Sequence, residues 1–118
     1  MGEGHRRSAL TVRRFGQVIR VRPERLDDYE RLHAEPWPGV LAAIRAANIR
    51  RYSIYRHGEL LLAYFEYVGE DFEADMAAMA ADSVVKDWWK LTDAMQEPFP
   101  ERDAGAWWLT IPEIFHTD

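Results

Sequence analysis

The sequence lacks cysteine and long apolar segments, and each absence excludes a class of protein. Because none of the 118 residues is cysteine, disulfides, thiolate nucleophiles and cysteine-bound metals are ruled out together. This absence is consistent with a protein of the reducing cytoplasm. No apolar run reaches the roughly 18–20 residues of a membrane helix, and the first dozen residues lack the apolar centre of a secretion signal. We therefore predict a cytoplasmic protein that contacts no membrane.

An excess of positive charge and the common catalytic motifs are also missing. The net charge is -5, which argues against nucleic acid as the main partner. The sequence contains no H-E-x-x-H zinc motif, no glycine-rich phosphate loop and no G-x-S-x-G motif. Asp27, Asp28 and Glu30 have no histidine or cysteine spaced beside them as a further metal ligand. We therefore expect no metal and no cofactor, and chemistry that depends on side chains alone.

The residues that are present suffice for one domain with one core. Hydrophobic residues make up 47% of the chain and charged residues 30%, as is usual in globular proteins. We expect residues 1–12 to form a flexible tail and residues 13–118 a single α+β domain. Apolar periodicity predicts strands at 13–22, 49–56, 59–67 and 106–111, helices at 23–36, 40–47, 71–81 and 84–95, and an extended loop at 96–105. Ser83 is expected to cap the last helix.

The order of these elements indicates the fold. Strands separated by helices around one hairpin predict a split βαβ, ferredoxin-like antiparallel sheet with helices on one face. The strand at 59–67 is apolar on both faces, which is typical of a central strand. A chain of this length has too few helices to cover both faces of the sheet. We therefore predict a homodimer of the dimeric α/β-barrel type, in which two sheets pack face to face.

The helix that ends near Pro36 carries the candidate catalytic residues. Tyr29 and His33 are four residues apart, so their side chains are neighbours on the inner stripe of the helix, with Cβ atoms roughly 5–6 Å apart. Imidazole, with a pKa of about 6.5, suits proton transfer near neutrality, and the phenol offers a second titratable proton. The alternative is a half-buried histidine bonded to a backbone carbonyl beside a tyrosine that fills the core. The pair predicts an acid–base centre.

Three further aromatic residues are candidates for ligand binding. Adjacent helical residues point about 100° apart, so one of Trp88 and Trp89 can enter the core while the other lines a cavity. An indole can stack on the C–H face of a sugar and donate its N–H. Tyr52 could direct its hydroxyl into the same cavity from a strand. The alternative is that these rings only fill the core, as most such residues do.

These residues, in this order, resemble the L-rhamnose mutarotase family. The resemblance covers residues 13–118 and is carried by Tyr29-x-x-x-His33-x-x-x-Trp37-Pro38, Tyr52 to Tyr55, Leu60 to Glu66, Trp88-Trp89-Lys90 and Glu113-Ile114-Phe115-His116. It implies a cofactor-free homodimer with a ferredoxin-like fold that interconverts the α and β anomers of a monosaccharide, L-rhamnose. It also implies that His33 is catalytic, that Tyr29 handles a proton and binds the sugar, and that Tyr52, Trp88 and Trp89 bind the sugar.

The sequence leaves several alternatives open. A long segment before Arg13 and the pair Arg50-Arg51 depart from the family pattern, so the preferred sugar could be L-rhamnose or L-fucose. A cofactor-free oxygenase and a non-catalytic sugar-binding module are rival functions, because the same fold serves several activities. The sequence also does not assign the acid and the base between His33 and Tyr29.

Overall fold

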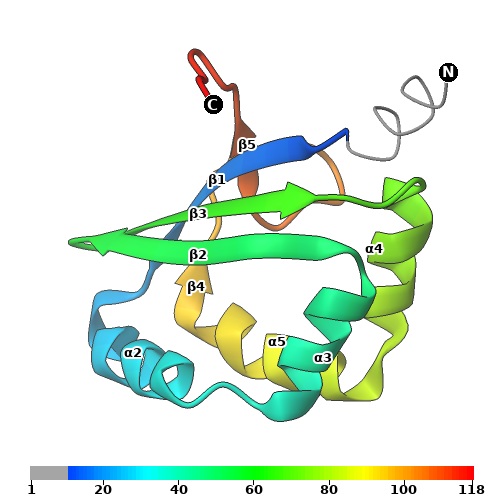
Figure 1. Cartoon of the computed structure of the whole chain (residues 1–118). Helices are drawn as coiled ribbons and strands as arrows, with labels where there is room; N and C mark the ends of the chain where they lie inside the picture. The colour runs from blue at the N-terminus through cyan, green and yellow to red at the C-terminus, as the bar shows by residue number, and fades with distance from the viewer. Residues whose placement is uncertain (1–10) are drawn as a thin grey trace, which may run out of the picture.

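The computed structural model describes residues 11–118, which form an antiparallel sheet with helices packed on one face (Figure 1). Residues 1–10 of the predicted tail lie outside the described residues. The elements are β1 (Arg13–Val21), the 3-10 turn η1 (Pro23–Arg25), α2 (Leu26–Ala34), α3 (Pro38–Ala46), β2 (Ile49–His57), β3 (Leu60–Tyr67), α4 (Phe72–Ala81), α5 (Ser83–Met95), β4 (Gln96–Glu97) and β5 (Leu109–Ile111).

The sheet has the strand order β2-β3-β1-β4, with β5 also paired to β1. β1 pairs along its length with β3, and β3 returns to β2 through a tight turn at Gly58, whose φ of 58° suits glycine. The other edge of β1 pairs with β5 at Gly16–Val18 and with β4 at Arg20–Val21. This order confirms the predicted α+β, ferredoxin-like sheet with helices on one face.

The last edge of the sheet differs from the prediction. Residues 96–105 were expected to form a loop, but Gln96–Glu97 continue directly from α5 as the short strand β4 against β1. The final strand begins at Leu109 instead of Ala106, because Trp107 belongs to the loop and donates its indole N–H to Gln96. The two short strands β4 and β5 therefore share the same edge of β1. The loop between them carries Trp107, which contacts Gln96.

One local prediction was wrong, and one predicted strand is irregular. Asp82, instead of Ser83, caps α5, because the Asp82 carboxylate accepts the backbone N–H groups of Val84 and Val85. β2 is also not regular, since one extra residue lies between Arg50 and Ser53, where Arg51 has a φ of 50°. Beyond this bulge, the side chains of β2 point to the opposite faces of the sheet from those that a regular strand would give them.

The bulge allows β2 to bury two residues that a regular strand would place on opposite faces. Ile49 pairs with Tyr67 and Ile54 with Ala63, and both partners on β3 are buried beneath the helices. Ile49 belongs to the buried cluster that also contains Ala47 and Phe65, against which α4 packs. Ile54 packs against the other cluster, formed by Ile19, Val21, Tyr29, Leu61 and Met95. Tyr29 and Leu61 of that second cluster line the candidate site.

Candidate active site

The site is built on α2, whose ends are fixed by local sequence. Pro23 starts the preceding turn, where its fixed φ suits the first turn of a helix. Asp27 and Asp28 lie in the first turn of α2, near the positive end of the helix dipole. Asp28 also forms ion pairs with Arg25 and Arg31 on the outer side. The polar side of α2 therefore faces water, and its other side faces the sheet.

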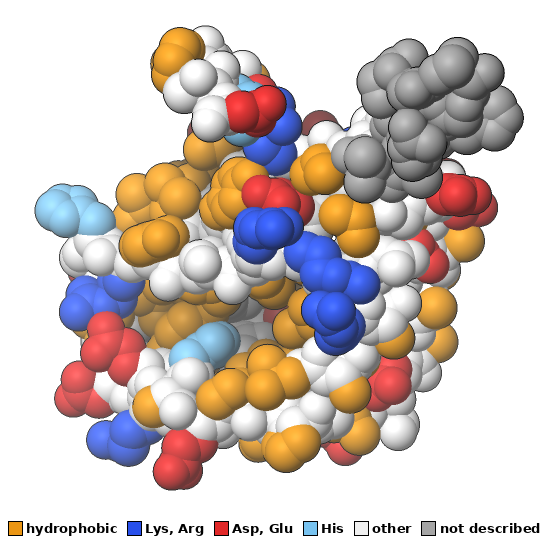
Figure 2. Space-filling view, in the orientation of Figure 1, with side chains coloured by type: hydrophobic (Ala, Val, Ile, Leu, Met, Phe, Trp, Pro, Cys, Tyr) orange, Lys and Arg blue, Asp and Glu red, His pale blue; other side chains and the backbone are white. Residues whose placement is uncertain are grey.

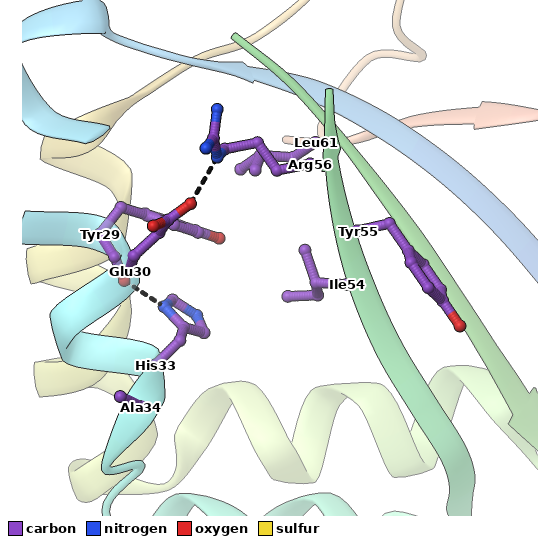
Figure 3. A pocket seen from close by; sticks show the side chains of 8 residues that line it. All are labelled: Tyr29, Glu30, His33, Ala34, Ile54, Tyr55, Arg56 and Leu61. Atoms are coloured by element: carbon purple, nitrogen blue, oxygen red, sulfur yellow. Dashed lines mark hydrogen bonds and ion pairs between the residues drawn. The ribbon is translucent and has the colours of Figure 1, made fainter. Parts of the chain in front are cut away.

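Between α2 and the sheet lies an open cavity of about 450 Å³, within the range of small-molecule sites. Figure 2 shows this face hollowed between the sheet and the helices, with hydrophobic side chains around the hollow. In Figure 3, Tyr29 and His33 extend from α2 on one side and face Ile54 of β2, whereas the Tyr55 ring points away. The lining residues are Tyr29, Glu30, His33, Ala34, Ile54, Tyr55, Arg56 and Leu61.

His33 is held as a neutral imidazole. Its Nδ1 lies 2.9 Å from the Tyr29 carbonyl oxygen. A carbonyl oxygen only accepts, so we assign the proton to Nδ1, which leaves the lone pair of Nε2 free. Burial lowers the pKa of His33 and outweighs the opposing effect of that hydrogen bond. The hydrogen bond to a backbone carbonyl, which a purely structural histidine would also make, is therefore present. The same hydrogen bond selects the tautomer whose Nε2 could act as a general base.

Tyr29 is held as a neutral phenol. The residue is 4% exposed, and its hydroxyl oxygen accepts a hydrogen bond of 3.0 Å from Gln96 Nε2. Burial raises the pKa of Tyr29 well above its usual range, the nearby Tyr52 raises it further, and the bond from Gln96 opposes them. The phenol therefore keeps its proton at neutral pH.

A stack of aromatic rings holds the histidine in place. The Tyr29 and His33 rings are stacked with their centroids 4.2 Å apart. The edge of Trp88 meets His33 at 5.1 Å, and Trp37 meets Trp88 at the same distance. These separations fall within the favourable range for aromatic pairs. The imidazole is therefore fixed on two sides, and Trp88 acts as its support from α5.

The remaining predicted sugar-binding residues are arranged less closely around the cavity. Tyr52 is 40% exposed; it lies near enough to Tyr29 to raise the pKa of that residue, and burial raises the pKa of Tyr52 to about 12. Trp88 is 6% exposed and reaches the site only through His33. Trp89 is 37% exposed and does not line the cavity. The structure thus brings Tyr29, His33 and Trp88 into contact, and the sugar-binding roles of Tyr52, Trp88 and Trp89 stay predictions.

Sequence reasoning missed other residues of the site. Gln96 is 3% exposed and contacts the Tyr29 hydroxyl, yet a single glutamine after a helix gives no signal of this kind. Arg56 of β2 forms an ion pair with Glu30 of α2 at the rim of the cavity (Figure 3). Opposite charges on a strand and on a preceding helix are too common to predict such a pair. The rim residues tie the two walls together.

The described residues, 11–118, contain neither a metal-binding cluster nor a membrane-spanning helix. Over that range, no group of three or more histidine, aspartate or glutamate side chains could hold a metal ion. None of the helices between β1 and the last described residue has the length and apolarity needed to cross a bilayer.

The α+β fold, with an imidazole and a phenol paired in its cavity, indicates the class, a small α+β isomerase. The model of the L-rhamnose mutarotase family matches residues 14–117, and the chain belongs to this family. It is 31% identical to L-rhamnose mutarotase of Ligilactobacillus salivarius, over 92% of this chain and all of that protein. It is also 31% identical to L-rhamnose mutarotase of one Klebsiella pneumoniae strain, over 84% and 92% of the two chains.

Solved structures show the same fold. The crystal structure of an L-rhamnose mutarotase from Formosa agariphila superposes with a TM-score of 0.69 at 19% identity, over 90% of this chain and 99% of that one. A conserved protein from Methanosarcina mazei superposes with a TM-score of 0.54 at 16% identity, over 77% and 86% of the two chains. At these identities the likeness supports the fold alone.

Proposed function

We propose that the chain interconverts the α and β anomers of L-rhamnose by opening and closing the pyranose ring. The observation that carries this proposal is the pairing of a neutral imidazole and a neutral phenol in one open cavity. The relatives named above, which are L-rhamnose mutarotases, support the choice of sugar. We further propose that the protein acts in the cytoplasm, in keeping with its lack of cysteine.

The reaction needs one proton acceptor and one proton donor. In the proposed first step, His33 Nε2 takes the proton of the anomeric hydroxyl while the Tyr29 hydroxyl gives its proton to the ring oxygen. The bond between the anomeric carbon and the ring oxygen then breaks and leaves the open-chain aldehyde. After rotation about the adjacent C–C bond, the hydroxyl formed from the former ring oxygen attacks the other face of the aldehyde carbonyl. Tyr29 recovers its proton from that hydroxyl, and His33 returns its proton to the carbonyl oxygen.

The contacts of the two side chains support this assignment of roles. Because His33 Nδ1 is occupied by the Tyr29 carbonyl, Nε2 is the nitrogen that can accept a proton. Because Gln96 donates to the Tyr29 hydroxyl, the phenolic proton is left to a ligand. Such positioned acid–base groups typically accelerate a reaction about 10²–10⁴-fold.

Proton NMR saturation transfer between the two anomers provides the direct test. We expect catalytic amounts of the protein to increase the exchange rate of L-rhamnose well above the uncatalysed rate. L-Fucose and a common aldohexose, measured at the same concentration, serve as comparisons. Faster exchange with L-fucose than with L-rhamnose would reassign the sugar within the same mechanism. No acceleration with any of the three sugars would refute the proposed function.

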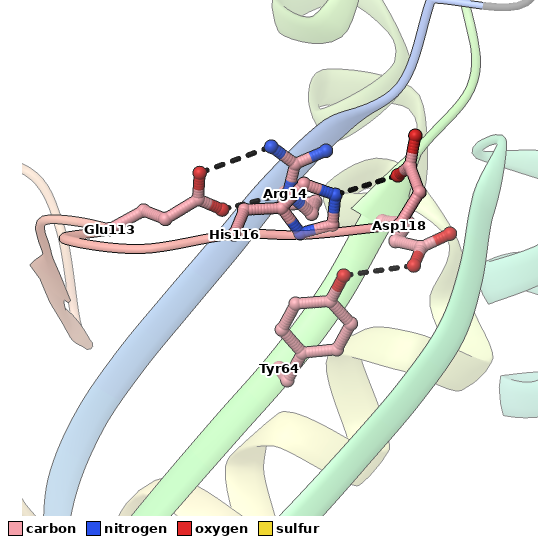
Figure 4. A network of polar contacts seen from close by, with 6 residues as sticks. Arg14, Tyr64, Glu113, His116 and Asp118 are labelled. Atoms are coloured by element: carbon pink, nitrogen blue, oxygen red, sulfur yellow. Dashed lines mark hydrogen bonds and ion pairs between the residues drawn. The ribbon is translucent and has the colours of Figure 1, made fainter.

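We also propose that two copies pair through the helix-free face of the sheet. Leu62 is 39% exposed on this face, between its cross-strand neighbours Val18 and Tyr55. An ion pair between Arg14 and Glu113 holds the C-terminal segment beside β1 (Figure 4). Beyond it, Ile114 and Phe115 are almost fully exposed. A second copy would bury this apolar surface, as expected for a closed symmetric pair.

A charge on the helix-free face should break the pair. We expect Leu62→Glu to yield a monomer, because a closed interface would bury two unpaired carboxylates. Leu41→Glu is the matched control, since Leu41 is 51% exposed on the helical layer. Light scattering after size-exclusion chromatography gives the mass of both variants. A dimeric Leu62→Glu variant, or a monomeric wild-type protein, would exclude this interface.

A further inference from the structure

The loop at residues 98–108 is held by hydrogen bonds from Arg102 and places the Trp107 indole against Gln96. Arg102 donates from Nε to the Ala106 carbonyl at 2.9 Å and from a terminal nitrogen to the Phe99 carbonyl at 3.0 Å. The Arg102 guanidinium also lies 5.8 Å from the Trp107 ring centroid, within reach of a cation–π contact. Trp107 in turn donates its indole N–H to Gln96 Oε1 at 2.8 Å. The loop therefore delivers a fixed donor to a buried amide.

That donor decides which way the Gln96 amide faces. A glutamine amide has an accepting oxygen and a donating nitrogen of similar size, so it can turn over in the same space. The indole N–H can only donate, and it therefore requires the oxygen on its side. The nitrogen is left to face Tyr29, where it donates to the hydroxyl oxygen at 3.0 Å. Gln96 is 3% exposed, so water cannot readily replace either partner.

We propose that Trp107 and Gln96 are positioning residues that aim the Tyr29 proton into the cavity. Gln96 occupies a lone pair of the hydroxyl oxygen, so the phenolic hydrogen must point elsewhere. Without the indole N–H the amide would be free to turn and accept that hydrogen, which would then be engaged inside the protein instead of bonded to substrate. This inference rests on the proposed function, in which Tyr29 is the proton donor.

The variant Trp107→Phe tests this arrangement because it keeps an aromatic ring at the position and removes the indole N–H together with part of the indole's bulk. We expect kcat for anomer exchange to fall about tenfold, the size of one neutral hydrogen bond, with KM little changed. Gln96→Glu should lower kcat further, because a carboxylate accepts from both neighbours. Trp108→Phe is the matched control for lost bulk, since Trp108 is an adjacent indole that packs against the cluster containing Tyr29, and we expect its kcat to fall much less than that of Trp107→Phe.

A second readout separates this inference from the proposed function. In protein labelled with ¹³C at tyrosine Cζ, the Tyr29 resonance, assigned with Tyr29→Phe, reports whether the phenol donates or accepts a hydrogen bond. We expect Trp107→Phe to shift this resonance toward that of a donating phenol, and Trp108→Phe to leave it in place. An unshifted resonance with unchanged kcat would overturn the positioning role while the proposed function stands. If the wild-type protein lacks mutarotase activity but Trp107→Phe still shifts the resonance, the proposed function is refuted. The role of Trp107 and Gln96 in orienting the Tyr29 hydroxyl then stands.

Discussion

Replacing His33 will lower the rate of anomer exchange by about 10²–10⁴-fold, the usual contribution of a positioned general base. His33→Gln is the preferred variant, because glutamine has similar bulk but cannot accept a proton at neutral pH. His33→Ala would also remove the ring that contacts Tyr29 and Trp88 and would combine two effects. Saturation transfer with L-rhamnose measures the loss, and circular dichroism checks that the fold is retained.

His57 supplies the matched control for this experiment. It is an exposed residue at the end of β2, and we expect His57→Gln to exchange anomers at the wild-type rate. A His33→Gln variant with near-normal activity would show that another group accepts the proton. Equal losses in both variants would indicate a general effect of removing an imidazole.

The pH dependence of kcat/KM in the wild-type protein tests the assignment of His33 as the general base. A general base acts in its deprotonated form, and burial lowers the pKa of His33. The rate constant kcat/KM should therefore stay level from neutral pH down past about 6.5, the ordinary pKa of histidine, and fall only at lower pH. An acid limb centred above that value would contradict the burial argument. The limb should be absent in the residual activity of His33→Gln.

The proximity of Tyr29 and His33 could be predicted from sequence because it depends on local geometry. Tyr29 and His33 share one turn of one helix, and helical spacing alone makes them neighbours. The prolines that bound this helix are also local signals, so the helix could be placed within a few residues. The hairpin at His57-Gly58 belongs to the same group of features. The outline of the sheet followed from the order of such elements.

The surroundings of the pair could not be predicted, because they depend on contacts between distant segments. Gln96 meets Tyr29 across 67 residues of chain, and its strand exists only because β1 leaves an edge free at Arg20–Val21. The bulge at Arg51 places the buried Ile49 and the partly buried Ile54 on the same, helix-covered face of the sheet. Sequence periodicity cannot show a register shift of one residue. The hydrogen bond between Gln96 and the Tyr29 hydroxyl could therefore not be predicted from the sequence.

Tyr29→Phe should lose exchange activity to a similar extent, about 10²–10⁴-fold, with the fold intact. Phenylalanine keeps the ring that stacks on His33 at 4.2 Å and removes only the hydroxyl. The buried Gln96 nitrogen then lacks its acceptor, so we also expect a loss of about 1–3 kcal/mol in the free energy of unfolding. Tyr64→Phe is the control, since its hydroxyl bonds Glu66 at 2.8 Å (Figure 4) and is remote from the cavity.

Combining the two substitutions tests whether the side chains act in one step. If His33 takes one proton while Tyr29 gives another, either single variant already prevents the concerted ring opening. The double variant Tyr29→Phe/His33→Gln should then be little slower than the slower single variant, as is usual for residues that act as a unit. Losses that multiply would instead indicate two independent contributions. A Tyr29→Phe variant with a near-normal rate would remove the phenol from the mechanism and leave His33 to work with water.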